Sequence, residues 1–375
     1  MSSASAFQEV FATARVSNPY SAAVFDKIAS CHTAKLGYHS YQCSEDSCKQ
    51  QQTLYHSCGN RHCPFCGSLK TMDWINDRRT ELLPTAYYHV VFTLPHEWNG
   101  LILAHRAPMF KMLFEAASQT LLAFGSNPKY LGAVPGITTV LHTWGQDLSF
   151  HPHLHCIVSG GGMHSTTGKW VAAKRANSTF LFPITGLRKV FKAKFLTLVR
   201  KLKLDTKINI PKLITDTGKL TWNVYAKAPF GSADAVVEYL GRYTHKIAIT
   251  KHRILEVSDT TVRFRYKDYQ DESKVKEMTL SRDEFVRRFE MHILPRHFVK
   301  IRHYGYLQNH GKYARLQVLR KSLGLSEFRP KVAIPLEMKA LLHFGINITI
   351  CPCCKKGKML LVRSVYPRNK GQPIP

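Results

Sequence analysis

The sequence has no long apolar run, no secretory leader pattern and no phosphate-binding loop. No stretch approaches the ~20 apolar residues that a transmembrane helix requires. The segment Met1–Val10 lacks a basic region followed by an apolar one, so no secretory signal is expected. A Gly-x-x-x-x-Gly-Lys-Ser/Thr motif is also missing. These absences predict a cytoplasmic protein without a P-loop nucleotide site.

Acidic residues are scarce. The chain has 25 Asp and Glu against 53 Lys and Arg, a formal charge of +28. Such a surplus indicates a polyanionic partner, most simply nucleic acid, whose binding should weaken steeply with salt. Apolar residues still make up 44% of the 375 positions, which allows two domains or one large domain with appendages. We find no internal repeat and no long low-complexity tract.

Three histidines alternate in His151-Pro152-His153-Leu154-His155. Alternate side chains of a strand point to the same face, so the three imidazoles would line one face. A single histidine there would suggest an ordinary surface strand. Three imidazoles on one face suit a divalent metal better, because neutral imidazole is a common ligand. We therefore predict a metal-binding strand over residues 151–159.

The preceding strand offers a further metal ligand. Residues 137–144 have a strand pattern, and residues 145–150 suit a hairpin that would bring His142 beside the histidine strand. We predict His142, His153 and His155 as the ligands. The competitors of His142 for the third position are His151, Gln146 and Asp147.

Two tyrosines share one face of a predicted helix. Ser232 is an N-cap candidate and the helix runs to about Thr244, so Tyr239 and Tyr243 lie four residues apart. Spacing alone favours a pair packed into the core. The neighbouring cationic residues favour a phosphate site instead: Arg242, His245 and Lys246. A tyrosine hydroxyl can attack a phosphodiester, aided by Mg²⁺ or Mn²⁺ on the histidines, although such a site also accepts Zn²⁺ or Co²⁺.

Nine of the ten cysteines fall in two clusters, which indicates metal binding in a reducing compartment rather than disulfides. Cys43-x4-Cys48 and Cys63-x2-Cys66 predict two halves of one tetrahedral zinc site. The additional candidates are Cys31, His56, Cys58 and His62, which could complete the same site or supply much of a second one. Cys351-Pro352-Cys353-Cys354 resembles half a zinc ribbon, but no partner is evident in the sequence, so a metal role and none are equally open.

Cationic residues also alternate with apolar ones along residues 261–267, after a predicted strand over residues 247–257. Val262 and Phe264 would pack on a core, while Arg263 and Arg265 would form a face that suits a DNA backbone. We predict DNA contacts from Arg242, His245, Arg263, Arg265 and Arg302.

Three short motifs occur in order: Val90-Val91-Phe92-Thr93-Leu94-Pro95, His153-Leu154-His155 and Tyr239-x-x-x-Tyr243. Flanking segments such as His142-Thr143-Trp144 and the tract from Leu294 to Gly305 accompany them. With the cysteine-rich segment in front, the set resembles the rolling-circle insertion-sequence transposases. These belong to the HUH endonuclease superfamily with two tyrosines and carry an N-terminal transposase zinc-binding domain. The resemblance spans residues 31–309.

The resemblance implies an α+β protein: a ferredoxin-like HUH domain with a central antiparallel sheet, plus a small N-terminal zinc-binding domain. We place these at residues 85–310 and 1–84, the latter with a helical lead-in, followed by a basic C-terminal region at 311–375 with a candidate cysteine knuckle. The implied activity is nicking and rejoining of single-stranded transposon ends and target DNA through a 5′-phosphotyrosine. The implied catalytic residues are Tyr239, Tyr243 and Lys246, with Mg²⁺ or Mn²⁺ at the histidines and Zn²⁺ in the N-terminal domain. The expected setting is the DNA of a prokaryotic cytoplasm.

Three other functions share parts of this pattern. A rolling-circle replication initiator or conjugative relaxase would use the same chemistry, and only the zinc segment and the flanking motifs argue against it. A zinc-dependent DNA-binding regulator without catalysis would leave the histidines and tyrosines without a role. A zinc hydrolase on the histidine strand lacks a nearby glutamate as general base.

Overall fold

The protein is a mixed α+β structure built on antiparallel sheets, seen in a computed structural model that describes residues 3–174, 180–227, 230, 233–244, 248–269, 271–328 and 334–367. The predicted class, with a central antiparallel sheet and a small N-terminal zinc-binding domain, is confirmed. Among the described residues, no helix combines the length and apolarity needed to cross a membrane.

The central sheet has six strands, and the histidine strand lies in its middle. The order is β11-β4-β5-β3-β7, with β6 paired to the far end of β5. All of these pairings are antiparallel. The strands are β3 (Tyr87–Thr93), β4 (Val134–Trp144), β5 (Phe150–Met163), β6 (Trp170–Ala172), β7 (Val224–Lys227) and β11 (Ile301–Gly305). Strands β4 and β5 form the predicted hairpin, and both are longer than the sequence indicated.

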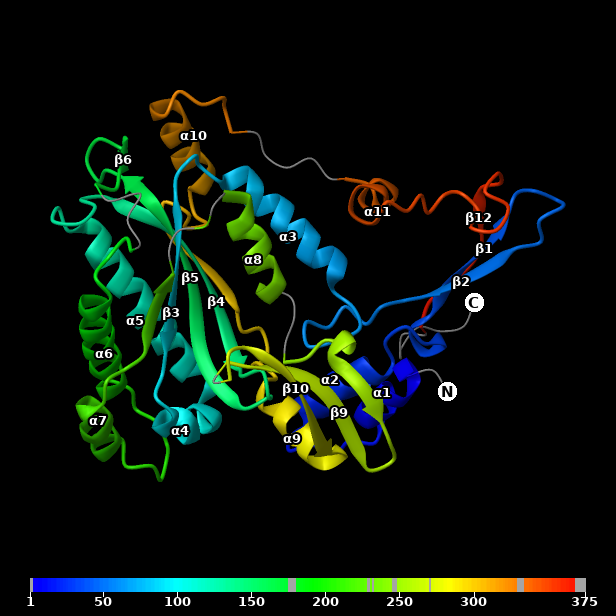
Figure 1. Cartoon of the computed structure of the whole chain (residues 1–375), viewed down its shortest axis with the longest axis horizontal. Coiled ribbons are helices and arrows are strands. Elements are labelled where there is room, and N and C mark those ends of the chain that lie inside the picture. Colours follow the sequence, from blue (N-terminus) through cyan, green and yellow to red (C-terminus); the bar gives the residue numbers. More distant parts are fainter. Residues whose placement is uncertain are drawn as a thin grey trace, which may run out of the picture.

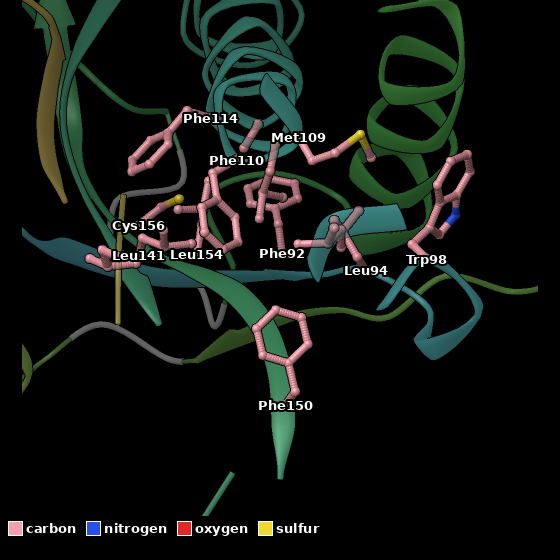
Figure 2. Packing of buried hydrophobic residues seen from close by; sticks show 14 of the residues in the cluster. Phe92, Leu94, Trp98, Met109, Phe110, Phe114, Leu141, Phe150, Leu154 and Cys156 are labelled. Carbon is pink, nitrogen blue, oxygen red and sulfur yellow. The ribbon is translucent and has the colours of Figure 1, made fainter. Parts of the chain in front are cut away.

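One face of this sheet packs on a helical layer and forms the main core. Phe92 of β3 and Leu154 of β5 meet Phe110 and Phe114 of α5 there (Figure 2). The helices of this layer are α4 (Asn99–Ala104), α5 (Arg106–Ser126), α6 (Ile184–Arg200) and α7 (Ile210–Lys219). Helices α4 and α5 are separated at His105. Pro108 lies in the first turn of α5, where its missing N–H costs no hydrogen bond.

Two helices cover the opposite face: α3 (Ser68–Glu81) and α8 (Ala233–Thr244) (Figure 1). Val236 of α8 is buried with Val140 of β4 and Ile157 of β5. The two helices cross closely at Gly241, where a Cβ atom would lie 2.3 Å from Cδ1 of Ile75. Helix α8 is therefore seated on the sheet and held from behind by α3.

A second sheet, of order β10-β9-β8, adjoins the first N-terminal helices. Its elements and those packed on it are α1 (Ser3–Ala12), α2 (Pro19–Ala29), β8 (Ile254–Val257), β9 (Thr261–Asp268), β10 (Lys274–Ser281) and α9 (Arg282–Met291). Phenylalanines of α1, α2 and α9 interlock, with Phe11 and Phe289 ring centroids 5.0 Å apart. The helical lead-in thus packs on α9.

The strand predicted over residues 247–257 is wrong in its first part. Residues 251–253 form a 3₁₀ turn, and Ala248 has a φ of 60°, which no strand residue adopts. Only Ile254–Val257 is extended as a strand. Apolar residues in this segment pack without sheet pairing, which residue type alone does not distinguish.

A third, small sheet of order β12-β1-β2 pairs a C-terminal strand with a hairpin from the N-terminal part of the chain (Figure 1). Its strands are β1 (Tyr38–Cys43), β2 (Gln51–Tyr55) and β12 (Met359–Val365), after a 3₁₀ turn at Ala34–Leu36. Helices α10 (Lys312–Ser322) and α11 (Leu336–Phe344) carry the chain from the main body to β12. The C-terminal region is therefore partly built into the cysteine-rich part of the protein.

Candidate functional site

Three histidines from neighbouring strands converge on one face of the central sheet. His153 and His155 lie on β5, and His142 of β4 pairs with His153. Nε2 of His155 is 3.1 Å from Nε2 of His153 and 3.1 Å from Nδ1 of His142. The three nitrogens all lie within 4.8 Å of one another. The structure thus brings together the three ligands predicted from the sequence.

The competitors of His142 lie outside this group. His151 is exposed, and its carbonyl oxygen accepts a hydrogen bond from Nδ1 of His153. The carboxylate of Asp147 accepts hydrogen bonds from the backbone N–H and the hydroxyl of Ser149. Gln146 offers its backbone carbonyl to Arg253. None of the three takes part in the histidine group within the described part of the chain.

Hydrogen bonds behind the rings indicate where the protons lie. Nδ1 of His153 is 2.6 Å from the carbonyl oxygen of His151, so it donates. Nδ1 of His155 is 2.8 Å from Nε2 of His89. A neutral imidazole that binds a metal through Nε2 carries its proton on Nδ1, and with His155 in that tautomer, donating to His89, both Nε2 atoms turn a lone pair toward the centre. Lone pairs so close repel one another unless a cation lies between them, so the donor set fits a divalent metal.

Burial keeps these imidazoles neutral. It lowers the pKa of His153 to about 4 and the pKa of His155 well below its usual value. The pKa of His89 is lowered to about 3 by the same cause. Metal binding requires the deprotonated ring, so the group is ready for a cation at neutral pH.

His89 links the histidines to a tyrosine, and sequence reasoning missed it. Its ring stacks on that of His155, with centroids 5.1 Å apart and planes 5° from parallel. The ring of Tyr239 meets His89 at 5.0 Å and 64°. Tyr239 is therefore one aromatic ring away from a candidate metal ligand. The only signal in the sequence was a histidine within the otherwise apolar and aromatic strand Tyr87–Thr93.

Helix α8 carries Tyr239 over the histidine face. The ring of Tyr239 also lies 5.3 Å from that of Phe230. Tyr243 lies one turn further along, at the C-terminal end of α8. The side chains of Arg242 and Tyr243 are outside the described part of the structure, as are the whole residues His245 and Lys246.

Two lysines add positive charge beside this group. Nζ of Lys227 lies 6.0 Å from the centre of the Tyr239 ring. Lys300 is buried, with Nζ 5.1 Å from the ring of Trp144, and that ring stacks on His142 at 4.4 Å. Burial lowers the pKa of Lys300 to about 7. Lys300 is therefore charged only in part at neutral pH, and the exposed ammonium of Lys227 is the one that suits a phosphate group.

The arginines predicted to contact DNA are placed elsewhere. Arg263 donates to Glu256 at 2.8 Å and to Glu277 at 3.1 Å, and Arg265 lies 3.9 Å from Glu277. The outer face of β9 is thus a surface of mixed charge rather than a cationic one. The guanidinium of Arg302 stacks on the Phe114 ring of α5 at 4.1 Å, on the face of the sheet opposite the histidines.

The cysteines form two clusters. The prediction that Cys43, Cys48, Cys63 and Cys66 share one site is therefore wrong, because the two pairs lie in different clusters. The first cluster is Cys31, Cys58, Cys63 and Cys66, which surrounds a point within the main core. Sγ of Cys58 is 3.8 Å from Sγ of Cys66, and backbone N–H groups donate to the sulfurs of Cys31 and Cys63. Four sulfurs in this arrangement fit a structural zinc ion.

The two histidines proposed as extra ligands do not join this cluster. Nε2 of His62 accepts a hydrogen bond from the backbone N–H of Leu294, and its Nδ1 lies 3.0 Å from Asn60 Oδ1. Burial lowers the pKa of His62 to about 3, which keeps the ring neutral in this bridging position. Nδ1 of His56 lies 3.0 Å from the carbonyl of Leu36.

The second cluster is Cys43, Cys48, Cys351 and Cys354. The C-terminal pair therefore has a partner pair, which the sequence did not reveal because the two lie at opposite ends of the chain. Cys353 is exposed and outside the cluster, and Cys156 is buried alone on β5, as a small core residue.

Comparison with known proteins places this chain, with its histidine group and two cysteine clusters, among DNA-processing enzymes of the transposase class. Residues 136–314 match the family model described as "Putative transposase", and residues 3–94 match the "Transposase zinc-binding domain". The second match spans the whole of the first cysteine cluster. No solved structure matches the chain.

Two relatives extend the likeness over most of the chain. It is 38% identical over 371 residues to "Putative transposase y4qJ" of Sinorhizobium fredii, covering 93% of this chain and 90% of the relative. It is 30% identical over 300 residues to "Transposase for insertion sequence element IS801" of Pseudomonas savastanoi pv. phaseolicola, covering 76% and 69%. The chain belongs to this family of insertion-sequence transposases, and the resemblance identified from its motifs is confirmed.

Proposed function

We propose that this transposase nicks and rejoins single-stranded DNA at the ends of its element through a covalent 5′-phosphotyrosine. The observation that carries the proposal is the connection from His142, His153 and His155 through His89 to Tyr239. A metal-type donor set and a tyrosine hydroxyl on one face of a sheet suit in-line attack on a phosphodiester.

In the cleavage step the phenolic oxygen of Tyr239 or Tyr243 attacks the scissile phosphorus. A P–O(Tyr) bond forms and the bond from phosphorus to the 3′ oxygen breaks. The phenol loses its proton and the departing 3′ oxygen gains one, so protons balance and no oxidant or nucleotide is consumed. Because one phosphoester replaces another, the reverse attack by a free 3′-hydroxyl rejoins a strand at similar free energy.

Each part of the site has a role in this step. His142, His153 and His155 would hold a Mg²⁺ or Mn²⁺ ion, which when bound polarises a non-bridging phosphate oxygen. His89 holds His155 with its lone pair facing inward. Lys227 supplies positive charge near the phosphate, and we assign Arg242, His245 and Lys246 to the same role from their place beside the tyrosines. Lys300, with a pKa of about 7, adds part of a charge at neutral pH.

The assay is the capture of a protein–DNA adduct. The full chain is incubated with single-stranded oligonucleotides from the ends of its own element and Mn²⁺ or Mg²⁺, then run on a denaturing gel. We expect an adduct that disappears in the Tyr239→Phe/Tyr243→Phe double variant and in His153→Ala. Tyr313→Phe is the matched control, because Tyr313 is exposed and its ring stacks on Phe328, a contact that phenylalanine retains.

Two results would overturn the proposal. An adduct of undiminished yield in the double phenylalanine variant would remove the tyrosines from the chemistry. Full cleavage by His153→Ala in the presence of a chelator would remove the metal. Nicking without joining of two element ends would instead favour a replication initiator or relaxase, and binding without any cleavage would favour a regulator.

A further inference from the structure

The small sheet β12-β1-β2 has almost no hydrophobic core of its own. Every residue of β2 is exposed, and only the two end residues of β12 are partly buried. Strand β12 nevertheless pairs with β1 from Tyr38↔Val365 to Cys43↔Met359. A three-stranded sheet with so little buried apolar surface needs another source of stability.

Four cysteines gather at one end of this sheet. Sγ of Cys43 is 3.6 Å from Sγ of Cys354, and Sγ of Cys48 is 3.8 Å from Sγ of Cys351. Both distances are far longer than the ~2.05 Å of a disulfide bond. All four sulfurs lie within 4.8 Å of one another, as around one tetrahedral ion.

The backbone around the sulfurs is shaped for thiolates. The N–H of Glu45 donates to Sγ of Cys43 at 3.4 Å, and the N–H of Gly357 donates to Sγ of Cys354 at 3.3 Å. A Cβ atom on Gly357 would lie 2.4 Å from Sγ of Cys43, so only glycine allows this close approach. Each pair of cysteines therefore comes from a turn that directs N–H groups at sulfur.

We propose that Cys43, Cys48, Cys351 and Cys354 form a second structural zinc site, separate from the cluster at Cys31, and that it clamps the C-terminal segment to the N-terminal hairpin. Zinc binding replaces four S–H bonds with four Zn–S bonds and releases four protons as the thiols become thiolates. The resulting charge of −2 is offset by lysines around the C-terminal pair: Lys355, Lys356 and Lys358.

The second cysteine site is also connected to α3, the helix that packs against α8 and its tyrosines. Between the main body and β12, the chain passes α11, where Lys339 pairs with Asp73 of α3 at 2.8 Å. Helix α3 in turn packs against α8 at Gly241. The second site thus anchors a segment that is tied to α3, although the proposal does not depend on the tyrosine chemistry.

Zinc content of the purified full chain tests the site. The reduced protein should hold about two zinc ions per chain, since each four-thiolate group binds one. Cys351→Ser/Cys354→Ser should lower this to about one, with the remaining ion at the first cluster. Cys353→Ser is the matched control, because Cys353 lies between the two ligands but is exposed and outside the cluster.

Two further measurements test the proposal if the Cys351→Ser/Cys354→Ser variant folds poorly. Gly357→Val keeps all four thiols but places a side chain against Cys43, so it should lower zinc retention at this site alone. Limited proteolysis should then cut between residues 334 and 358 faster than in the control. The proposal would be overturned if Cys351→Ser/Cys354→Ser and Gly357→Val each still held two zinc ions. It would also be overturned if the parent chain held one zinc ion that Cys63→Ser loses and Cys351→Ser/Cys354→Ser keeps.

Discussion

Nε2 of His89 lies 2.8 Å from Nδ1 of His155, so a histidine on β3 supports a candidate metal ligand on β5 from behind. Such partners fix the orientation and tautomer of a ligand and raise its basicity. The same ring of His89 touches Tyr239. One side chain therefore adjoins both halves of the proposed nicking centre.

Replacement of His89 should weaken metal binding more than it weakens the fold. We expect His89→Ala to raise the Kd for Mn²⁺ by about 10–100-fold, because His155 loses the acceptor for its Nδ1 proton. Isothermal titration with Mn²⁺ measures this directly, without cleavage. His96→Ala, at an exposed histidine away from the site, should bind Mn²⁺ as the parent does. Equal affinities in the two variants would exclude a supporting role for His89.

A methyl group at the α3–α8 crossing should destabilise the protein. Alanine normally stabilises a helix relative to glycine, by roughly 0.5–1 kcal/mol. At Gly241 the added Cβ would meet Ile75 at 2.3 Å, so we expect Gly241→Ala to cost about 1–3 kcal/mol instead. Gly218→Ala in α7, where the nearest atom is 3.9 Å away, should be neutral or stabilising. Urea denaturation of both variants gives the two signs, and a stabilised Gly241→Ala would contradict the close crossing.

Stability should fall with acid through His292, which is fully buried. Its Nε2 donates to the carbonyl of Leu148, and its Nδ1 accepts from the hydroxyl of Thr143. Burial lowers its pKa from 6.5 to about 4, so the unfolded chain binds a proton more readily than the folded one between these values. The stabilisation is therefore present above pH 6.5 and is lost as pH falls toward 4, by about 3 kcal/mol in total.

The contribution of His292 is isolated by comparing pH profiles. The free energy of unfolding is measured between pH 7 and pH 4 for the parent and for His292→Gln. The variant should be less stable at pH 7 but should show a shallower decline. Parallel profiles would mean that His292 does not carry the pH dependence.

Two cationic residues should differ in their effect on DNA affinity. Lys227 is exposed beside Tyr239, so Lys227→Ala should weaken binding of single-stranded DNA and reduce the salt slope by about 0.7. Arg263 lies between Glu256 and Glu277, so Arg263→Ala should change affinity less. Fluorescence anisotropy at several salt concentrations provides both quantities. A larger loss of DNA affinity in Arg263→Ala than in Lys227→Ala would indicate that the DNA binds along the β10-β9-β8 sheet instead.

Loss of the first cysteine cluster should affect the whole fold. Its turn carries Phe65, whose ring lies 5.4 Å from that of Phe7, and Phe7 packs on Phe285 of α9. We expect Cys63→Ser to lower Tm by roughly 5–10 °C, because the metal-organised turn is part of the main core. Cys351→Ser should lower Tm less, since the second cluster lies in an exposed sheet. Scanning calorimetry of both variants tests this order.

The sequence was most informative where a pattern is local. Alternation placed His153 and His155 on one face of a strand, and helical spacing placed Tyr239 and Tyr243 on one helix, because both periods are set by the backbone itself. The short hairpin brought His142 to the same place, since a short connection leaves little choice of partner strand. The family resemblance followed from the order of these local motifs.

Relationships between distant segments could not be predicted in the same way. Spacing identifies a pair of cysteines as half a zinc site but says nothing of which other pair completes it. Arg302 was predicted to contact DNA, yet the register of β11 turns it to the α5 face. Arg263 alternates correctly, but the glutamates that pair with it come from two other strands.

The union of β1 with β12 also sets the order in which the protein can be completed. Cys43 and Cys354 are 311 positions apart, so a ribosome working at roughly 5–20 residues per second makes the second about 15–60 s after the first. During that interval the β1–β2 hairpin lacks β12, and the thiols of Cys43 and Cys48 lack the two cysteines that complete their cluster. A message cut short before the codons for β12 would leave it so, and the small sheet is therefore complete only in translation products that include this strand.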